Sequence, residues 1–81
     1  MKKVKYFGAT WCGPCQTFKP IMKEIALEGY NVEFIDIDQN QQEANKHGVK
    51  GVPTTIILED DKELGRFIGA QTKQIIVDKL K

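Results

Sequence analysis

Trp11-Cys12-Gly13-Pro14-Cys15 holds both cysteines of this 81-residue chain, with two residues between them. A pair at this spacing serves two kinds of chemistry, because one thiol can attack a mixed disulfide held by the other, or both can bind a metal ion. The stretch follows the apolar run Lys2 to Gly8 and precedes a segment with helical periodicity. It therefore marks the junction of a strand and a helix.

The segment after Cys15 predicts an amphipathic helix of roughly four turns. Its apolar residues recur at intervals of three and four, namely Phe18, Met22, Ile25 and Ala26. Gly29 is placed as a glycine just past a helix end. Pro20 lies inside the pattern, and we expect a kink there because proline removes an internal hydrogen bond.

The rest of the chain predicts three further strands and two further helices. The strands are expected at Val32 to Ile37, Thr54 to Leu58 and Leu64 to Ile68. The first of them is apolar on both faces, which is typical of a strand covered on both sides. Asn40 and Glu43 have the spacing of a capping box that opens a short helix ending at Gly48. Thr72 to Leu80 predicts the last helix, with its apolar side chains Ile76, Val77 and Leu80 directed inward.

The resulting order is β-α-β-α-β-β-α. A helix joins the first two strands, which predicts a parallel pair with a right-handed crossover. The polar turn Glu59 to Lys62 joins the last two, which predicts an antiparallel pair. We therefore expect one α/β domain over residues 1–81, with a four-stranded mixed sheet covered by helices on both faces.

The charge balance excludes a strong electrostatic partner. Lys plus Arg number 12 and Asp plus Glu number 11, so the net charge is only +1. This gives no footprint for nucleic acid or an anionic membrane surface. No apolar run approaches the ~20 residues of a membrane span, and Lys5 and Gly8 interrupt any signal-peptide core. We expect a monomer in the cytoplasm.

The two cysteines are expected to differ in role. Cys12 opens the helix, where unpaired backbone N–H groups carry partial positive charge and stabilise a thiolate. Cys15 lies one turn further in and is expected to be less exposed. Pro14, after Gly13, fits this placement because a first helical turn tolerates its missing N–H. Trp11 is expected to cover one side of the sulfurs.

Metal binding is the alternative use of the pair. A structural zinc site usually needs four ligands, and besides the cysteines the chain offers only His47 as a nitrogen ligand. We expect His47 to be a surface residue in the last turn of another helix. Binding by one chain is therefore disfavoured, while a metal or cluster shared between two chains stays open.

Gly51-Val52-Pro53-Thr54, just before the third strand, is the second informative motif. Proline at the start of a strand avoids a position whose N–H the sheet needs. Alone, this is an ordinary loop proline. If the Val52–Pro53 bond is cis, however, the loop turns sharply and presents the backbone of Val52 beside the sulfurs.

Together the two motifs resemble those of thioredoxins. The similarity extends to Pro20 in the first helix, to Asp38-Gln39-Asn40, and to further single positions at Lys46, Gly48 and Gly69. The resemblance implies that Cys12 attacks, Cys15 resolves and Pro53 is a cis-proline, with Gly13 and Pro14 supporting the cysteines. It also implies a groove for an extended substrate segment, lined by Trp11, Gly51, Val52, Pro53, Thr54 and Gly69.

The function implied is that of a thiol–disulfide oxidoreductase that reduces protein disulfides. Its partner would be a thioredoxin reductase that supplies electrons from NADPH, and the chain itself would bind no cofactor. Two alternatives stay open. One is a glutaredoxin-like enzyme that uses glutathione, although the tyrosine common between glutaredoxin cysteines is absent. The other is a non-catalytic interaction module with the same fold.

Three departures from the family pattern bear on mechanism. The chain begins at what would be the family's central strand, a reduced architecture similar to that of glutaredoxins. The family's buried acid is replaced by Tyr6, and the lysine that partners it is replaced by Phe34. That pair is credited with moving the proton of the resolving cysteine. Without it, we expect Cys15 to pass its proton directly to water or to a thiolate.

Overall fold

The computed structural model describes all 81 residues, in seven elements. They are β1 (Lys2–Gly8), α1 (Gly13–Leu27), β2 (Asn31–Asp36), α2 (Gln41–Lys46), β3 (Thr54–Glu59), β4 (Lys62–Ile68) and α3 (Lys73–Leu80). The strands form one sheet in the order β2-β1-β3-β4. β1 runs parallel to β2 and antiparallel to β3, and β3 and β4 are antiparallel. The predicted fold class and element order are confirmed.

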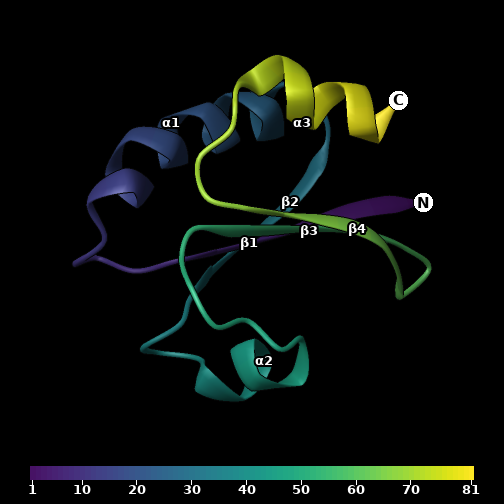
Figure 1. Cartoon of the computed structure of the whole chain (residues 1–81). Helices are drawn as coiled ribbons and strands as arrows, with labels where there is room; N and C mark the ends of the chain where they lie inside the picture. Colours follow the sequence, from purple (N-terminus) through teal and green to yellow (C-terminus); the bar gives the residue numbers. More distant parts are fainter.

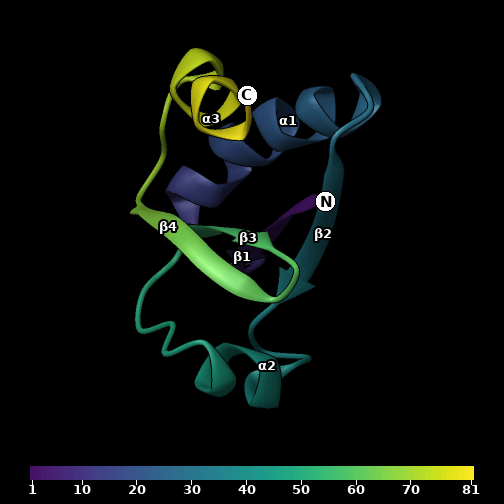
Figure 2. The same cartoon turned by 90° about the vertical axis from the view of Figure 1, so that its right-hand side faces the viewer.

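Helices cover both faces of the sheet. α1 and α3 lie on one face and α2 on the other (Figure 1), and the perpendicular view in Figure 2 shows the same three layers. The core under α1 and α3 contains the buried residues Val4, Tyr6, Phe18, Met22, Ile25, Ile57, Ile76, Val77 and Leu80. The core over α2 contains Phe7, Ile35, Ala44, Ile56 and Leu58. Each large apolar side chain fully buried here contributes about 1.5–3 kcal/mol.

α1 begins and ends where the sequence predicts. Cys12 is its N-cap, and its buried residues Cys15, Phe18, Met22 and Ile25 form one face. The helix is continuous through Pro20 and ends at Leu27, with Glu28 as its C-cap. Gly29 follows with a φ of 103°, a left-handed conformation that favours glycine. The kink at Pro20 stays a prediction.

The prediction that both faces of the second strand are covered is only half right. Ile35 is buried, but the ring of Phe34 is 39% exposed. β2 forms one edge of the sheet, so no neighbouring strand adds cover beyond Phe34. An apolar side chain does not by itself reveal which strand is at an edge.

The β3–β4 hairpin is short and irregular. Its two turn residues, Asp60 and Asp61, both have positive φ, as the tight hairpin turns require. Gly65 pairs with Ile57 and Glu63 with Leu58, so Leu64 is the extra residue of a β-bulge. Gly65, which has no side chain to pack, follows the bulge directly.

Arg66 connects β4 to the end of α2. Its guanidinium forms two hydrogen bonds of 2.8 Å with the carboxylate of Glu63, and it donates to the carbonyl oxygen of His47 at 2.7 Å. Such a bidentate pair holds the guanidinium in one orientation and pairs its charge with a carboxylate. The arrangement therefore ties the sheet edge to the layer below it.

α2 contains half of the predicted capping box. The side chain of Asn40 accepts the amide N–H of Glu43 at 3.4 Å. The carboxylate of Glu43 does not return to Asn40, because it bonds the ammonium of Lys5 and lies 3.2 Å from Nε2 of His47.

The prediction that His47 is a surface residue is wrong. Only 13% of its side chain is exposed, and its ring packs 5.9 Å from that of Phe7. The C-cap position of α2 directs the ring toward the sheet, where Phe7 and Glu43 cover it.

The Lys5–Glu43–His47 cluster predicts a pH-dependent contribution to stability. The hydrogen bond from Lys5, aided by His47, lowers the pKa of Glu43 below its ordinary value of 4.5. A carboxyl with a lowered folded pKa stabilises the fold above its unfolded pKa, and this is lost as the pH falls through the folded value. We expect Glu43→Gln to lower the free energy of unfolding by about 1 kcal/mol at pH 7. Urea denaturation as a function of pH measures this.

The deficit of Glu43→Gln relative to the parent chain should shrink as the pH falls below 4.5. Glu59→Gln is the matched control, because Glu59 is exposed and forms no ion pair. A deficit that stayed constant down to about pH 3 would show that the charge of Glu43 contributes nothing.

Candidate active site

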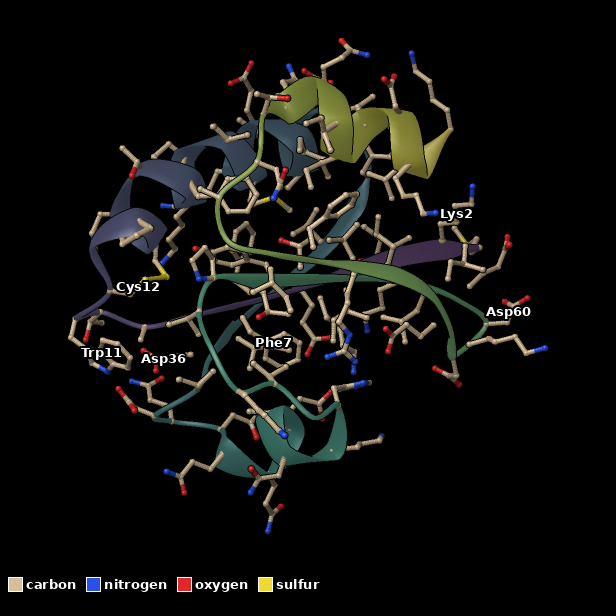
Figure 3. The ribbon with its side chains drawn as sticks, in the orientation of Figure 1. Lys2, Phe7, Trp11, Cys12, Asp36 and Asp60 are labelled. Atoms are coloured by element: carbon tan, nitrogen blue, oxygen red, sulfur yellow. A yellow bond between two sulfur atoms is a disulfide. The ribbon has the colours of Figure 1, made fainter.

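Cys12 and Cys15 lie where β1 gives way to α1, and a disulfide joins them (Figure 3). Their Cα atoms are 5.2 Å apart. The sulfurs are well covered, since Cys12 is 5% and Cys15 only 3% exposed. Ala9 packs with both cysteines, and Ile37 and Val52 add apolar cover. The site is a covered pair of sulfurs at a helix start.

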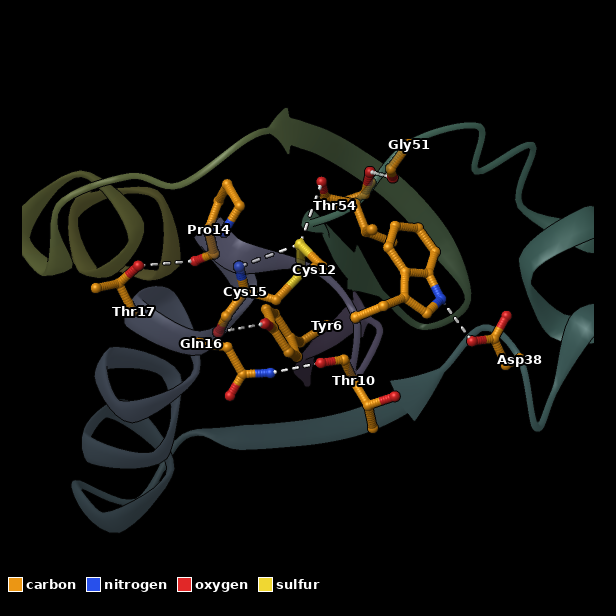
Figure 4. The surroundings of a disulfide bond; sticks show 12 residues. Tyr6, Thr10, Cys12, Pro14, Cys15, Gln16, Thr17, Asp38, Gly51 and Thr54 are labelled. Atoms are coloured by element: carbon orange, nitrogen blue, oxygen red, sulfur yellow. Dashed lines mark hydrogen bonds between the residues drawn. A yellow bond between two sulfur atoms is a disulfide. The ribbon is translucent and has the colours of Figure 1, made fainter.

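The sulfur of Cys12 caps the helix. It accepts the amide N–H of Cys15 at 3.2 Å, as Figure 4 shows. This N–H is one of those that have no partner within the helix. When the disulfide opens, a thiolate at this position keeps the same donor and faces the positive end of the helix dipole. The geometry therefore favours the ionised form of Cys12.

Hydrogen bonds fasten the motif to its surroundings. Gln16 donates its side-chain N–H to the carbonyl oxygen of Thr10 at 3.0 Å (Figure 4). The hydroxyl of Thr17 donates to the carbonyl oxygen of Pro14 at 3.2 Å. Around Gly13 there is open space, because a Cβ added there would meet nothing within 4 Å. These two surface hydrogen bonds hold the start of α1, while Gly13 itself is exposed and has no neighbour on its open side.

The loop Gly51–Thr54 lies against the cysteines. The Val52–Pro53 peptide bond is cis, as the sequence resemblance implied. The carbonyl oxygen of Val52 lies 3.7 Å from Sγ of Cys12. The hydroxyl of Thr54 donates to the carbonyl oxygen of Gly51 at 2.6 Å, which closes the loop on itself. The fold thus brings together two motifs that are 40 residues apart.

Gly69, which directly follows β4, is hydrogen-bonded to this loop. Its N–H donates to the carbonyl oxygen of Pro53 at 2.8 Å, and its φ of +93° favours glycine. By contrast, Val52 makes no backbone–backbone hydrogen bond within the chain. The N–H of Val52 is therefore available to another molecule, while its carbonyl oxygen contacts Sγ of Cys12.

Trp11 lies beside the motif with 66% of its surface exposed. Its indole N–H donates to Oδ2 of Asp38 at 2.7 Å (Figure 4). The sequence analysis did not identify this role for Asp38. The signal was its place just after the second strand, whose carboxyl end lies beside that of the parallel first strand.

Residues 2–81 match the family model of thioredoxin. The chain belongs to the thioredoxin family. It is a thiol–disulfide oxidoreductase of the protein-disulfide reductase type, and Cys12 and Cys15 are its exchanging pair.

Curated thioredoxins resemble the chain over most of its length. The thioredoxin of Bacillus subtilis (strain 168) is 34% identical over 73 residues, which are 86% of this chain and 70% of that protein. The thioredoxin of Mycobacterium tuberculosis (strain ATCC 25618 / H37Rv) is 36% identical over 77 residues, 91% of this chain and 66% of that one. The chain thus spans about two thirds of the length of these relatives.

Solved thioredoxins share the fold. A mutant thioredoxin from Halobacterium salinarum NRC-1 superposes with a TM-score of 0.90 at 34% identity, covering 96% of this chain and 70% of that one. The thioredoxin from Trypanosoma brucei brucei gives 0.89 at 36% identity, covering 99% and 72%.

No candidate membrane span occurs, since no helix is both long and apolar enough to cross a bilayer. No group of three or more His, Cys, Asp or Glu side chains lies in a metal-binding arrangement.

Below Cys15 the chain departs from the thioredoxin pattern. Tyr6 is 2% exposed, and its hydroxyl donates to the carbonyl oxygen of Cys15 at 3.4 Å. Its ring packs edge-on against Phe18 and Phe34, with centroids 5.9 and 5.7 Å apart. Burial raises the pKa of Tyr6, so the phenol is neutral at physiological pH. Aromatic packing therefore occupies the place that the sequence resemblance assigns to the family's acid–lysine pair.

A cavity of about 360 Å³ opens beside Cys15. It lies between α1 and the carboxyl ends of β1 and β2, and Tyr6 and Phe34 line part of it. Its lining also includes the charged residues Lys19 and Asp36. Sequence reasoning missed this cavity, because it depends on the register that sets Gly8 beside Asp36.

Tyr6→Phe tests whether the phenol is structural. The change removes one buried hydrogen bond and keeps the ring packing, so we expect the free energy of unfolding to fall by about 0.5–1 kcal/mol. Urea denaturation measures it. Tyr6→Leu is the comparison, and loss of the ring contacts should cost about 2 kcal/mol or more. Equal costs for the two variants would contradict a packing role for the ring.

Proposed function

We propose that Cys12 is the nucleophile and Cys15 the resolving thiol in the reduction of protein disulfides. The observation that supports this most is the position of Cys12 at the helix cap. Its sulfur accepts the N–H of Cys15 and lies 3.7 Å from the backbone of Val52, next to open space at Gly13. Cys15 is instead directed inward, against Tyr6 and the cavity.

The exchange then proceeds in two steps. The Cys12 thiolate attacks one sulfur of a substrate disulfide, which breaks that bond and forms a mixed disulfide. The Cys15 thiolate attacks Sγ of Cys12, the substrate's remaining thiolate leaves, and the Cys12–Cys15 disulfide forms. Two electrons pass to the substrate, whose two sulfurs each take up a proton. The proton of Cys15 goes to water or to the leaving thiolate, since neither Tyr6 nor Phe34 is a base.

The substrate segment is proposed to bind along a groove beside Cys12. Trp11, Gly51, Val52, Pro53, Thr54 and Gly69 are its lining. Val52 supports this assignment because its N–H and C=O form no backbone hydrogen bond within the chain. An extended peptide can pair with them as a strand pairs with a sheet edge. Gly13 and Pro14 are exposed beside Cys12 and are proposed to support the cysteine pair.

The proposed partners are a thioredoxin reductase, which draws electrons from NADPH, and proteins that contain a disulfide. Membership of the thioredoxin family supports both. We further propose that the chain works as a monomer in the cytoplasm, where a reductase keeps its cysteines in the dithiol form.

Reduction of insulin disulfides with two recycling systems tests this function. We expect NADPH with thioredoxin reductase to sustain turnover, and glutathione with glutathione reductase to support it at least tenfold less. Turnover with glutathione alone would favour a glutaredoxin-type enzyme instead.

The two cysteine roles are tested by trapping. Cys15→Ser should accumulate a mixed disulfide between Cys12 and the substrate, because the resolving thiol is gone. Cys12→Ser should accumulate none. Mass spectrometry of the intact adducts measures both, and the reverse pattern would exchange the two roles.

A further inference from the structure

The resolving cysteine borders a space that water can enter. Cys15 is only 3% exposed, yet it lines the cavity of about 360 Å³ between α1 and the ends of β1 and β2. A water molecule occupies about 30 Å³ in the liquid, so several fit. A thiol there can exchange its proton with water without reaching the outer surface.

Charged groups face this cavity from two of its walls. α1 contributes Lys19, and β2 contributes Asp36 at its carboxyl end. β1 contributes Tyr6, which is neutral. Any Cys15 thiolate therefore experiences one positive and one negative side chain across the same water-accessible space.

Lys19 is placed to affect a Cys15 thiolate more strongly than Asp36 does. It follows Cys15 by four residues, and side chains at this spacing are neighbours on one helix face. Its ammonium forms no hydrogen bond or ion pair elsewhere in the chain. Asp36 lies on the opposite wall, and its Oδ1 already accepts the amide N–H of Asp38 at 2.9 Å. The positive group is thus a neighbour of Cys15 on the same helix face and is uncommitted to any other partner.

We propose that Lys19 stabilises the thiolate of Cys15 across this cavity, and thereby supplies the electrostatic support that the Tyr6 and Phe34 positions lack. The inference rests on the proposed resolving role of Cys15. The Cys15 thiol gives its proton to water in the cavity, and the thiolate attacks Sγ of Cys12. The sulfur–sulfur bond to the substrate breaks, and the substrate thiolate leaves and takes a proton from solvent. Lys19 is a positioning residue, since it forms no bond to a reacting atom.

A background of Cys12→Ser isolates the effect, because it leaves Cys15 as the only thiol. With ¹³Cβ-labelled cysteine, NMR follows the ionisation of that thiol directly. We expect Lys19→Met to lower the thiolate fraction at pH 7 about threefold, as expected for loss of a nearby charge that is partly screened by solvent. Lys19→Arg keeps the charge and should restore the parent value. The effect should weaken as salt is raised, because an exposed ammonium is screened.

Lys23→Met is the matched control. It removes the same charge from the same helix one turn further on, and Lys23 does not line the cavity. Its effect on the thiolate fraction should be at most a third of that of Lys19→Met. Equal effects of the two variants would show that only the net charge of the chain matters, and this would overturn the proposal. No effect from either variant would overturn it as well.

A kinetic measurement separates this role from a structural one. In the chain with both cysteines, rapid mixing with a disulfide substrate resolves formation of the mixed disulfide from release of the second substrate thiol. We expect Lys19→Met to slow release about threefold at pH 7 and to match the parent rate at high pH, where the thiol is ionised in both. Formation of the mixed disulfide should be unchanged. Slower release at every pH would indicate distortion of the site and overturn the electrostatic role.

The two proposals fail in different ways. If Cys12→Ser, and not Cys15→Ser, trapped the substrate, the assigned cysteine roles would be wrong whatever the NMR titration gave. If trapping behaved as proposed and Lys19→Met left the titration unchanged, only the role of Lys19 would be lost.

Discussion

β1 is hydrogen-bonded on both sides, to β2 in parallel and to β3 in antiparallel register, and its side chains alternate between two cores. Tyr6 packs under α1 and α3, while Phe7 packs over α2. A slip of one residue would exchange these faces and expose both cores at once. Cys12 lies only four residues after the end of this strand. The register of β1 therefore fixes where the sulfurs lie.

The same strand decides what lies below the active site. Tyr6 faces Cys15, belongs to the larger core together with Phe18, and packs edge-on against the half-exposed ring of Phe34. A neutral aromatic group here strengthens packing but removes an ionisable group from the site. The cavity beside it is lined in part by Cys15 and is large enough for several water molecules. The ring thus serves packing, and the cavity is the proposed place of proton exchange.

Local sequence signals predicted the elements well, because each depends on neighbours along the chain. The apolar spacing of α1, Asn40 at the start of α2 and Gly29 at a helix end are signals of this kind. Features that depend on contacts between distant segments were missed. Phe34 is exposed because β2 is an edge strand, and His47 is covered because α2 packs on Phe7. The same holds for the site. The cis peptide bond at Pro53 could be anticipated from the sequence, whereas the hydrogen bond between Trp11 and Asp38 depends on the strand register.

The bulge in β4 has a consequence for how molecules of this protein meet. β4 is an edge strand, and an edge offers unpaired N–H and C=O groups on which a strand of another chain can assemble. Here Leu64 breaks the regular spacing of those groups, and the paired charges of Glu63 and Arg66 lie on the same stretch. An approaching strand would find neither a straight template nor an apolar one. The irregular hairpin thus protects this edge of the sheet against edge-to-edge pairing at high concentration.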